Sequence, residues 1–240
     1  MTELSIILPV QNEAEIIEQV FSEIFHSIKK ITKKPEFILV ENGSSDNSLK
    51  VIKKISQNYP NTLWAEAPKG YGWAVLKGLT LAEGKFVCYM DSDGQTNLST
   101  IPKLLEEIKS GKWDLVTVTR QNRESAWRVF TSKLFTEVMA LLFNTPKIDI
   151  NAKPKIFQNK HLSKLSLKSK DSFIDAEFLI KAIKLGFKIK EIPTKTLPRL
   201  GGKSTRSVKT YFEFFLNIWR FKFGKALVEW EKRDLETKKE

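Results

Sequence analysis

Short apolar runs alternate with longer amphipathic stretches through the first half of the chain, and this alternation constrains the fold more than any other feature. Five runs have the length and composition of buried strands: 4–8, 37–40, 62–65, 85–90 and 113–118. Four stretches between them repeat apolar residues at helical spacing: 13–28, 46–55, 70–82 and 98–108. Strands that alternate with helices form a parallel sheet with helices on its faces. We therefore predict a doubly wound, mainly parallel α/β domain, whose ligands bind beyond the carboxyl ends of the strands.

The pattern changes after Arg120. The sequence there predicts a long amphipathic helix over 126–143, a strand over 154–157, a helix over 174–185 and a strand over 188–192. From 208 to 230, aromatic side chains are interleaved with lysine and arginine, which predicts one C-terminal amphipathic helix. Such a helix either lies in a membrane interface, with its cations against anionic lipid, or packs on the domain.

The basic excess of the chain is unevenly distributed. The 240 residues carry a formal net charge of +12. Residues 1–150 hold 18 basic and 18 acidic side chains, whereas residues 151–240 hold 22 basic and 10 acidic ones. This asymmetry indicates an anionic partner for the C-terminal part: nucleic acid, an anionic membrane face or a phosphorylated substrate.

Segments typical of secreted or membrane-spanning proteins are missing from the pattern. No stretch has the roughly 18 apolar residues that a spanning helix requires. The N-terminal apolar run is too short for a signal peptide and carries an early acid in place of a basic region. The single cysteine, Cys88, excludes an intrachain disulfide and fits a reducing compartment. We therefore expect a cytoplasmic protein.

Two carboxylates follow the strand at 85–90, as Asp91-Ser92-Asp93-Gly94-Gln95. Carboxylates one residue apart repel each other unless a cation is present, and Mg²⁺ and Mn²⁺ prefer oxygen ligands. Asp91, Asp93 and Gln95 are therefore candidate metal ligands. The alternative is a solvated turn, because short Asp-x-Asp triplets are common by chance.

Three further segments lie at a strand exit or a helix start, where a nucleotide would bind. Pro-Val-Gln-Asn-Glu at 9–13 follows the first strand, Glu-Asn-Gly-Ser at 41–44 ends the second, and Lys-Gly-Tyr-Gly at 69–72 opens the third helix. Together with Asp-x-Asp, these segments resemble the family 2 glycosyltransferases of the GT-A fold. The markers of that family are a Pro-x-x-Asn-Glu start, an Asp-Asp-Gly-Ser turn, a Gly-rich helix start and an Asp-x-Asp.

The second half narrows the resemblance to polyprenyl-phosphate sugar transferases of the dolichyl-phosphate mannose synthase type. Arg120, Arg128 and Ser132 match the phosphate-binding residues of that group, and the segment 193–204 resembles its acceptor loop. The resemblance covers about residues 4–206. We accordingly divide the chain into a glycosyltransferase domain and a basic aromatic helix. The ranges are 1–206, of which 1–120 would bind the nucleotide and 121–206 the acceptor, and 207–240.

The resemblance implies transfer of a hexose from a nucleoside diphosphate sugar, GDP-mannose or a UDP-hexose, to dolichyl or undecaprenyl phosphate. Mannose is favoured and glucose is the other candidate. Mg²⁺ or Mn²⁺ is the implied cofactor. The implied ligands of the nucleotide sugar are Pro9, Asn12, Glu13, Glu41, Gly43, Lys69, Gly70, Asp91, Ser92 and Asp93.

The acceptor phosphate has its own implied ligands, since repulsion between two anions calls for arginine and lysine. They are Arg128, Ser132, Arg199, Lys203 and Ser204. The catalytic candidates are Asp93, Arg120 and Arg128. Asp175 and Glu177 resemble the acidic motif near the acceptor and would orient the sugar, or else form an acid pair that the helix dipole favours.

The resemblance also implies a peripheral enzyme on the cytoplasmic face of a membrane, attached by residues 207–240 or through a separate membrane-spanning subunit. Two other functions remain open. One is a soluble family 2 transferase that acts on a saccharide or protein hydroxyl and uses Asp175 or Glu177 as its base. The other is a nucleic-acid-binding module, which explains the charge but not the metal motif, so we expect no nucleic-acid partner.

The sequence departs from the family pattern at three places. Gln11 stands where the family usually has Tyr or Phe, and Glu41 replaces the first Asp of the Asp-Asp pair. Lys153-Pro154-Lys155 stands where many mannose synthases have a Gly-Phe-Arg type sequence. These departures bear on the nucleotide, the sugar and the lipid more than on the reaction.

Overall fold

The computed structural model describes residues 1–121, 126–198, 200 and 208–237, with backbone alone for 126–130, 132–133, 208–214 and 234–237. The strands are β1 (Leu4–Val10), β2 (Pro35–Glu41), β3 (Thr62–Glu66), β4 (Phe86–Tyr89), β5 (Leu115–Arg120), β6 (Lys155–Gln158) and β7 (Ile189–Thr194). The helices are α1 (Ile17–Lys29), α2 (Ser48–Asn58), α3 (Tyr71–Leu81), α4 (Ile101–Lys109), α5 (Ala126–Phe143), α6 (Leu162–Leu165), α7 (Ile174–Lys184), α8 (Val208–Phe223) and α9 (Lys225–Thr237). Two 3₁₀ turns, η1 (Leu98–Thr100) and η2 (Asn159–His161), precede α4 and α6.

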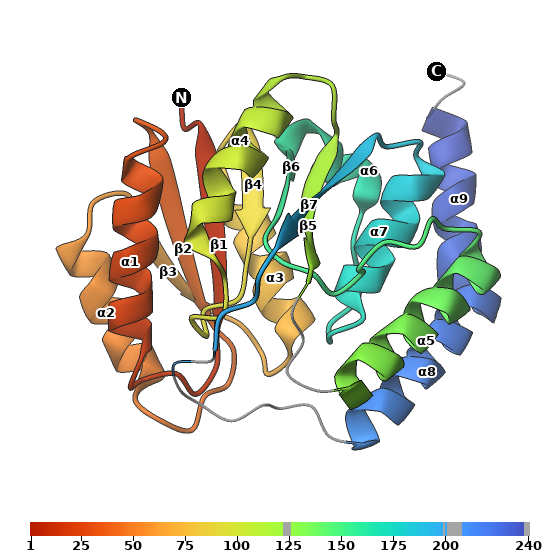
Figure 1. The fold of residues 1–240 in the computed structure, drawn as a ribbon, viewed down its shortest axis with the longest axis horizontal. Helices are drawn as coiled ribbons and strands as arrows, with labels where there is room; N and C mark the ends of the chain where they lie inside the picture. Colours follow the sequence, from red (N-terminus) through yellow and green to blue (C-terminus); the bar gives the residue numbers. More distant parts are fainter. Residues whose placement is uncertain (122–125, 199, 201–207, 238–240) are drawn as a thin grey trace.

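The strands described form one seven-stranded sheet in the order β3-β2-β1-β4-β6-β5-β7. β6 runs antiparallel to its neighbours β4 and β5, and the other paired strands are parallel. The carboxyl ends of the parallel strands lie at one edge of the sheet, the lower edge in Figure 1. The predicted mainly parallel α/β fold is confirmed.

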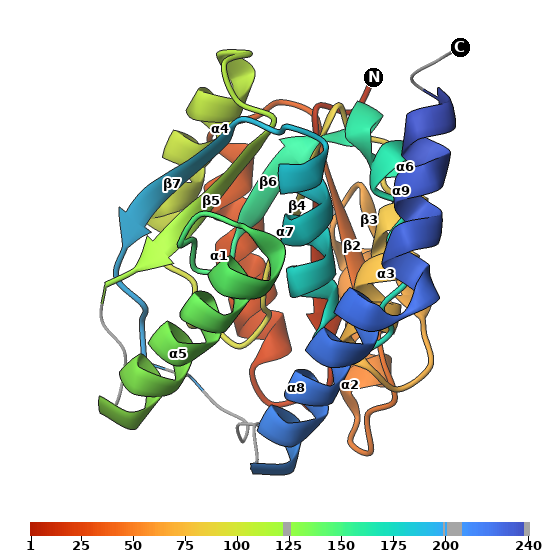
Figure 2. The ribbon, with the colours of Figure 1, turned by 90° about the vertical axis from the view of Figure 1, so that its right-hand side faces the viewer.

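Helices cover both faces of this sheet (Figures 1 and 2). α1, α2 and α4 pack on one face, and α3, α5, α7, α8 and α9 pack on the other. Strand β1 serves both layers, because successive side chains of a strand point to opposite faces. Ile6 and Leu8 belong to the first core cluster and Ile7 to the second. The sheet is therefore a rigid central layer that ends at the predicted ligand edge.

The C-terminal segment forms two helices, α8 and α9, so the prediction of one helix over 208–230 is corrected. The break lies at Gly224, where a Cβ would collide with the carbonyl oxygen of Arg220. One face of the pair is buried in the core through Ile218, Phe221, Leu227 and Trp230. Among the helices that the structure describes, none is long and apolar enough to cross a membrane.

Candidate functional site

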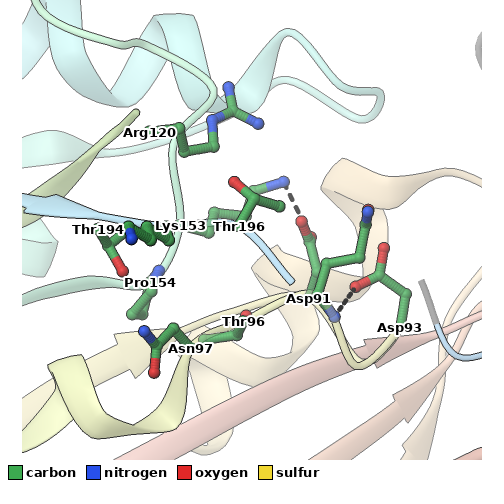
Figure 3. Close-up of a pocket in the computed structure, with 11 residues that line it drawn as sticks. Asp91, Asp93, Thr96, Asn97, Arg120, Lys153, Pro154, Thr194 and Thr196 are labelled. Atoms are coloured by element: carbon green, nitrogen blue, oxygen red, sulfur yellow. Dashed lines mark hydrogen bonds and ion pairs between the residues drawn. The ribbon is translucent and has the colours of Figure 1, made fainter. Parts of the chain in front are cut away.

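A small cavity of about 40 Å³ lies where the exits of β4, β5 and β7 and the start of β6 meet (Figure 3). All three candidate metal ligands line it, and so does Arg120. The lining residues are Asp91, Asp93, Gln95, Thr96, Asn97, Arg120, Lys153, Pro154, Thr194, Lys195 and Thr196. The structure therefore brings together residues predicted from four separate parts of the sequence.

The loop of the Asp-x-Asp motif contacts the segment that follows β7. Asp93 is buried, and its Oδ1 accepts a hydrogen bond from the backbone N–H of Gln95 at 3.0 Å. The N–H of Leu197 donates to the carbonyl oxygen of Gln95 at 3.0 Å. A Cβ on Gly94 would lie 2.7 Å from Leu200 Cδ1, so only glycine fits against this segment. The first residues of the predicted acceptor loop thus lie directly on the predicted metal loop.

The ammonium of Lys153 lies between two carboxylates. Its Nζ is 3.0 Å from Asp91 Oδ1 and 3.2 Å from Asp175 Oδ2, and Figure 3 shows the contact with Asp91. The same Nζ lies 4.0 Å from the ring centroid of Tyr71, which is a cation–π distance. The Tyr71 hydroxyl is buried with no partner at hydrogen-bond geometry among the described residues. Burial and the charges of Asp91 and Asp175 raise its pKa, so this hydroxyl stays protonated.

Asp175 is only 2% exposed and lies behind Lys153. Its Oδ1 accepts hydrogen bonds from Tyr89 Oη at 2.9 Å and from Lys155 Nζ at 3.0 Å. Burial alone would raise the pKa of Asp175, but the charges of Lys153 and Lys155 lower it to about 2. This carboxylate is therefore ionised and fully engaged by side chains of the protein.

Glu177 holds a loop in place. Its carboxylate, buried on α7, accepts hydrogen bonds from the backbone N–H groups of Lys168 at 3.0 Å and Ser169 at 2.6 Å. It also pairs with the ammonium of Lys181 at 2.6 Å. The loop fixed in this way reaches α3, where the N–H of Trp73 donates to the carbonyl oxygen of Lys170 at 3.1 Å. The contacts of Glu177 are thus to the protein.

The glycines at the start of α3 make room for this loop. A Cβ on Gly70 would lie 2.6 Å from the carbonyl oxygen of Lys170, and a Cβ on Gly72 would lie 2.6 Å from its carbonyl carbon. The φ of Gly70 is +141°, a conformation that L side chains rarely adopt. Both glycines are therefore explained by packing, and binding of the nucleotide by Gly70 stays a prediction.

Other predicted ligands of the nucleotide tie the strand exits to one another. The hydroxyl of Ser92, buried after β4, lies 2.6 Å from the carbonyl oxygen of Pro9 and contacts the carboxylate of Glu13. The N–H of Asn12 donates to Ser44 Oγ at 3.0 Å. The exits of β1, β2 and β4 are thereby held in fixed positions at one edge.

The exit of β2 contacts the segment before α3. Gly43 has a φ of +80°, and a Cβ there would lie 2.9 Å from the Cβ of Lys69. Glu41 is buried and accepts a hydrogen bond from the N–H of Ser44. The side-chain oxygen of Asn42 is buried with no hydrogen-bond partner among the described residues. A buried acceptor in this state can be satisfied by a donor group of a ligand.

Arg120, at the end of β5, forms a bidentate ion pair with Asp149. Its Nε is 3.0 Å from Asp149 Oδ2 and its Nη2 is 2.9 Å from Asp149 Oδ1. Burial works to lower the pKa of Arg120, but Asp149 outweighs it and the pKa is raised. The backbone N–H of Asp149 donates to Glu191 Oε1 at 3.2 Å. A guanidinium has five N–H donors, and this pair uses two of them.

The remaining predicted ligands of the acceptor phosphate are not placed. Arg199, Lys203 and Ser204, together with the glycines at 201 and 202, lie outside the described residues. Arg128 and Ser132 belong to α5, but their side chains lie outside the described part as well. Their roles stay predictions.

Sequence reasoning missed several residues of the cavity: Thr96, Asn97, Lys153, Thr194, Lys195 and Thr196. Thr96 and Asn97 directly follow the metal motif, so their place at a strand exit was a usable signal. Lys153 precedes a strand that runs antiparallel, and its approach to Asp91 depends on the insertion of β6 between β4 and β5. Chain order alone does not reveal that contact.

Comparison with known proteins identifies the family. The family model for glycosyl transferase family 2 matches residues 5–167. The chain belongs to glycosyl transferase family 2. The metal-type loop, the strand-exit residues and most of the cavity described above lie within the matched range.

Two curated relatives are similar to this glycosyltransferase. The undecaprenyl-phosphate 4-deoxy-4-formamido-L-arabinose transferase of Proteus mirabilis is 31% identical over 143 residues, which cover 58% of this chain and 44% of that protein. The dolichol-phosphate mannosyltransferase of Pyrococcus furiosus is 29% identical over 243 residues, which cover 95% of this chain and 64% of that protein. The glycosyltransferase thus spans less than two thirds of the length of each relative.

Solved structures with the same fold include the glucosyl-3-phosphoglycerate synthase of Mycobacterium tuberculosis. Its complex with Mn²⁺, uridine diphosphate and phosphoglyceric acid matches with a TM-score of 0.70 at 18% identity, covering 93% of this chain and 79% of that one. Its complex with Mg²⁺ and uridine diphosphate matches with a TM-score of 0.69. The likeness confirms the predicted GT-A fold.

Proposed function

We propose that the glycosyltransferase moves a hexose from a nucleoside diphosphate sugar to a polyprenyl phosphate. The observation that carries this proposal is the mixed lining of one cavity. Asp91, Asp93 and Gln95 present oxygen atoms, while the cations of Arg120, Lys153 and Lys195 line the same space. Oxygen ligands for a divalent cation beside cations for phosphate suit a reaction that joins two phosphorylated substrates.

The donor binds across the exits of β1, β2 and β4 in this proposal. Asn42 supports it, because its buried side-chain oxygen can accept a hydrogen bond from the base or ribose. Asp91, Asp93 and Gln95 fit Mg²⁺ or Mn²⁺, since their donor atoms are hard oxygens that line one cavity. When bound, such an ion would stabilise the negative charge of the leaving diphosphate. The protein itself orients the donor between the strand exits.

The acceptor is a group that needs no general base. A phosphate is already ionised at neutral pH, whereas a hydroxyl must lose a proton when it attacks. Asp175, a base in the alternative mechanism, has a pKa of about 2 and lies buried against two lysines. Glu177, the other candidate, is only 1% exposed and binds Lys168, Ser169 and Lys181. Both observations favour a phosphate over a saccharide or protein hydroxyl.

Arg120 would contact one of the two phosphates. It keeps a fixed orientation through Asp149 and directs the remaining part of its guanidinium toward the cavity that it lines. Arg128, Ser132, Arg199, Lys203 and Ser204 complete the acceptor site in this proposal. Mannose is the favoured sugar, since one relative is a dolichol-phosphate mannosyltransferase, and glucose is the other candidate, since a fold neighbour binds UDP-glucose.

The membrane partner would bind an exposed apolar surface on α5 and α8. This surface consists of Leu134, Leu141, Phe215, Leu216, Trp219 and Phe223. Trp219 and Phe223 are 64% and 59% exposed, and their ring centroids lie 4.3 Å apart. Arg220 and Lys222 lie between them in the sequence, and both helices begin on the side of the strand exits (Figures 1 and 2). Aromatic side chains beside cations are typical of a helix at an anionic membrane surface.

The test is a transfer assay with each labelled nucleotide sugar in turn, Mn²⁺ or Mg²⁺, and a polyprenyl phosphate in vesicles. Sugar label that moves into the organic phase with one donor is expected. Sugar that moves only to water-soluble acceptors, with every donor tried, would overturn the polyprenyl proposal and leave the family assignment intact.

A further inference from the structure

The candidate metal carboxylate Asp91 is already paired within the protein. Its Oδ1 accepts a hydrogen bond from Lys153 Nζ at 3.0 Å. The Lys153 side chain is only 9% exposed, and the Tyr71 ring lies against its ammonium at 4.0 Å. The ammonium is therefore held at Asp91 by burial and by an aromatic face.

A divalent cation at Asp91 would lie close to this ammonium. Both are cations, both are attracted by the same carboxylate, and they repel each other strongly where solvent screening is weak. A cation that enters must therefore displace the ammonium from Asp91 or bind against its charge.

The structure provides a second partner for the displaced ammonium. Asp175 Oδ2 lies 3.2 Å from Lys153 Nζ on the side away from the cavity lining, and Asp175 also keeps its pair with Lys155 at 3.0 Å. A small rotation of the Lys153 side chain can thus release Asp91 without leaving a buried charge unpaired. The phosphate oxygens of a donor in the same cavity would be a further partner.

We propose that Lys153 and the divalent cation compete for Asp91, so that the enzyme binds metal weakly alone and tightly with a nucleoside diphosphate. This inference rests on the proposed function for the nature of the donor. Lys153 is then a positioning residue that couples metal binding to donor binding. Its side chain also keeps Asp91 and Asp175 from repelling each other before the metal arrives.

The test measures Mn²⁺ binding by calorimetry to the full chain, first with MnCl₂ alone and then with saturating UDP or GDP. Lys153→Met should bind Mn²⁺ alone about tenfold more tightly than the unchanged protein. The difference should shrink with nucleotide bound, because the diphosphate attracts the ammonium. Lys153→Arg, which keeps the charge, should retain the weak binding to Mn²⁺ alone.

The matched control is Lys195→Met, which removes an exposed cation from the lining of the same cavity. It should change the affinity for Mn²⁺ alone by less than about twofold, since its solvated charge is screened. Circular dichroism and an unfolding midpoint establish that each variant is folded, and Lys153→Gln serves if the methionine variant is not.

Equal affinity of the Lys153→Met and unchanged proteins for Mn²⁺ alone would overturn this inference. An equal gain in Lys195→Met would overturn it too, because the effect would then be the general potential of the cavity. Absence of sugar transfer to any polyprenyl phosphate would defeat the proposed function, yet it would not alter the result with MnCl₂ alone. The two failures are therefore distinguishable.

Discussion

Lys155 Nζ and Asp175 Oδ1 lie 3.0 Å apart, and both side chains are almost completely buried behind the candidate active site. Lys155 also donates to the carbonyl oxygen of Ala152 at 2.7 Å, which fixes the chain just before Lys153. The ion pair therefore links α7 to the start of β6 and sets the position from which Lys153 reaches Asp91.

Removal of the Asp175 charge should destabilise the protein in a pH-dependent way. Asp175→Asn leaves two buried lysines without their carboxylate and should cost about 3 kcal/mol at pH 7. The pKa of Asp175 is about 2 in the folded protein and 3.8 in its ordinary state. Its stabilisation is thus complete above about pH 4 and is lost as the pH falls through 2. Denaturant unfolding at several pH values should show the gap between the two proteins narrowing below pH 4, and a constant gap would contradict this account.

Space for the loop at 168–170 should be essential at Gly72. Gly72→Ala places a Cβ against the carbonyl groups of Ser169 and Lys170 and should lower the free energy of unfolding by about 1–3 kcal/mol. Thr80→Ala, at an exposed position of the same helix, should change it by less than about 0.5 kcal/mol. Thermal unfolding of both variants provides the measurement, and equal midpoints would contradict the packing role.

The fork of Arg120 should matter more than its charge. Arg120→Lys keeps a cation but cannot form the bidentate pair with Asp149 or present a planar fork to phosphate. We expect kcat/KM for sugar transfer to fall by at least about tenfold. Lys147→Ala, which breaks an exposed ion pair with Glu137, is the control and should leave kcat/KM unchanged. Full activity of the Arg120→Lys enzyme would remove Arg120 from the phosphate site.

Binding to anionic vesicles should depend on the exposed aromatic residues of α8. Trp219→Ser with Phe223→Ser should lower the vesicle-bound fraction in a flotation assay by about tenfold or more, because two large apolar side chains no longer enter the interface. Val228→Ser changes an exposed apolar residue on α9 and should bind as the unchanged protein does. High salt should weaken binding through Arg220 and Lys222. Equal flotation of all variants would place the membrane surface elsewhere.

The sequence predicted most of the fold because its signals are local. Strands such as 37–40 are runs of apolar residues, and the helix over 13–28 repeats buried positions such as Val20 and Ile24 at helical spacing. The strand exits then follow from the rule that parallel strands end at one edge. Asp91, Asp93, Gln95 and Arg120 were predicted for this reason and do line one cavity.

The features that sequence reasoning missed are those that depend on tertiary contacts. Lys153 reaches Asp91 only because β6 is inserted between β4 and β5. Gly70 was predicted from its motif, but the carbonyl of Lys170, a hundred residues away, explains why a side chain does not fit there. The break at Gly224 was missed because the amphipathic pattern continues across it into α9.

The central claim is that the acceptor is a phosphate that reacts without a general base. The most direct measurement compares labelled hexose transfer to a polyprenyl phosphate and to the polyprenol of the same length, at the same density in the same vesicles. We predict organic-soluble label with the phosphate and only background with the alcohol. Equal transfer to the polyprenol, or transfer confined to a water-soluble hydroxyl acceptor, would contradict the account.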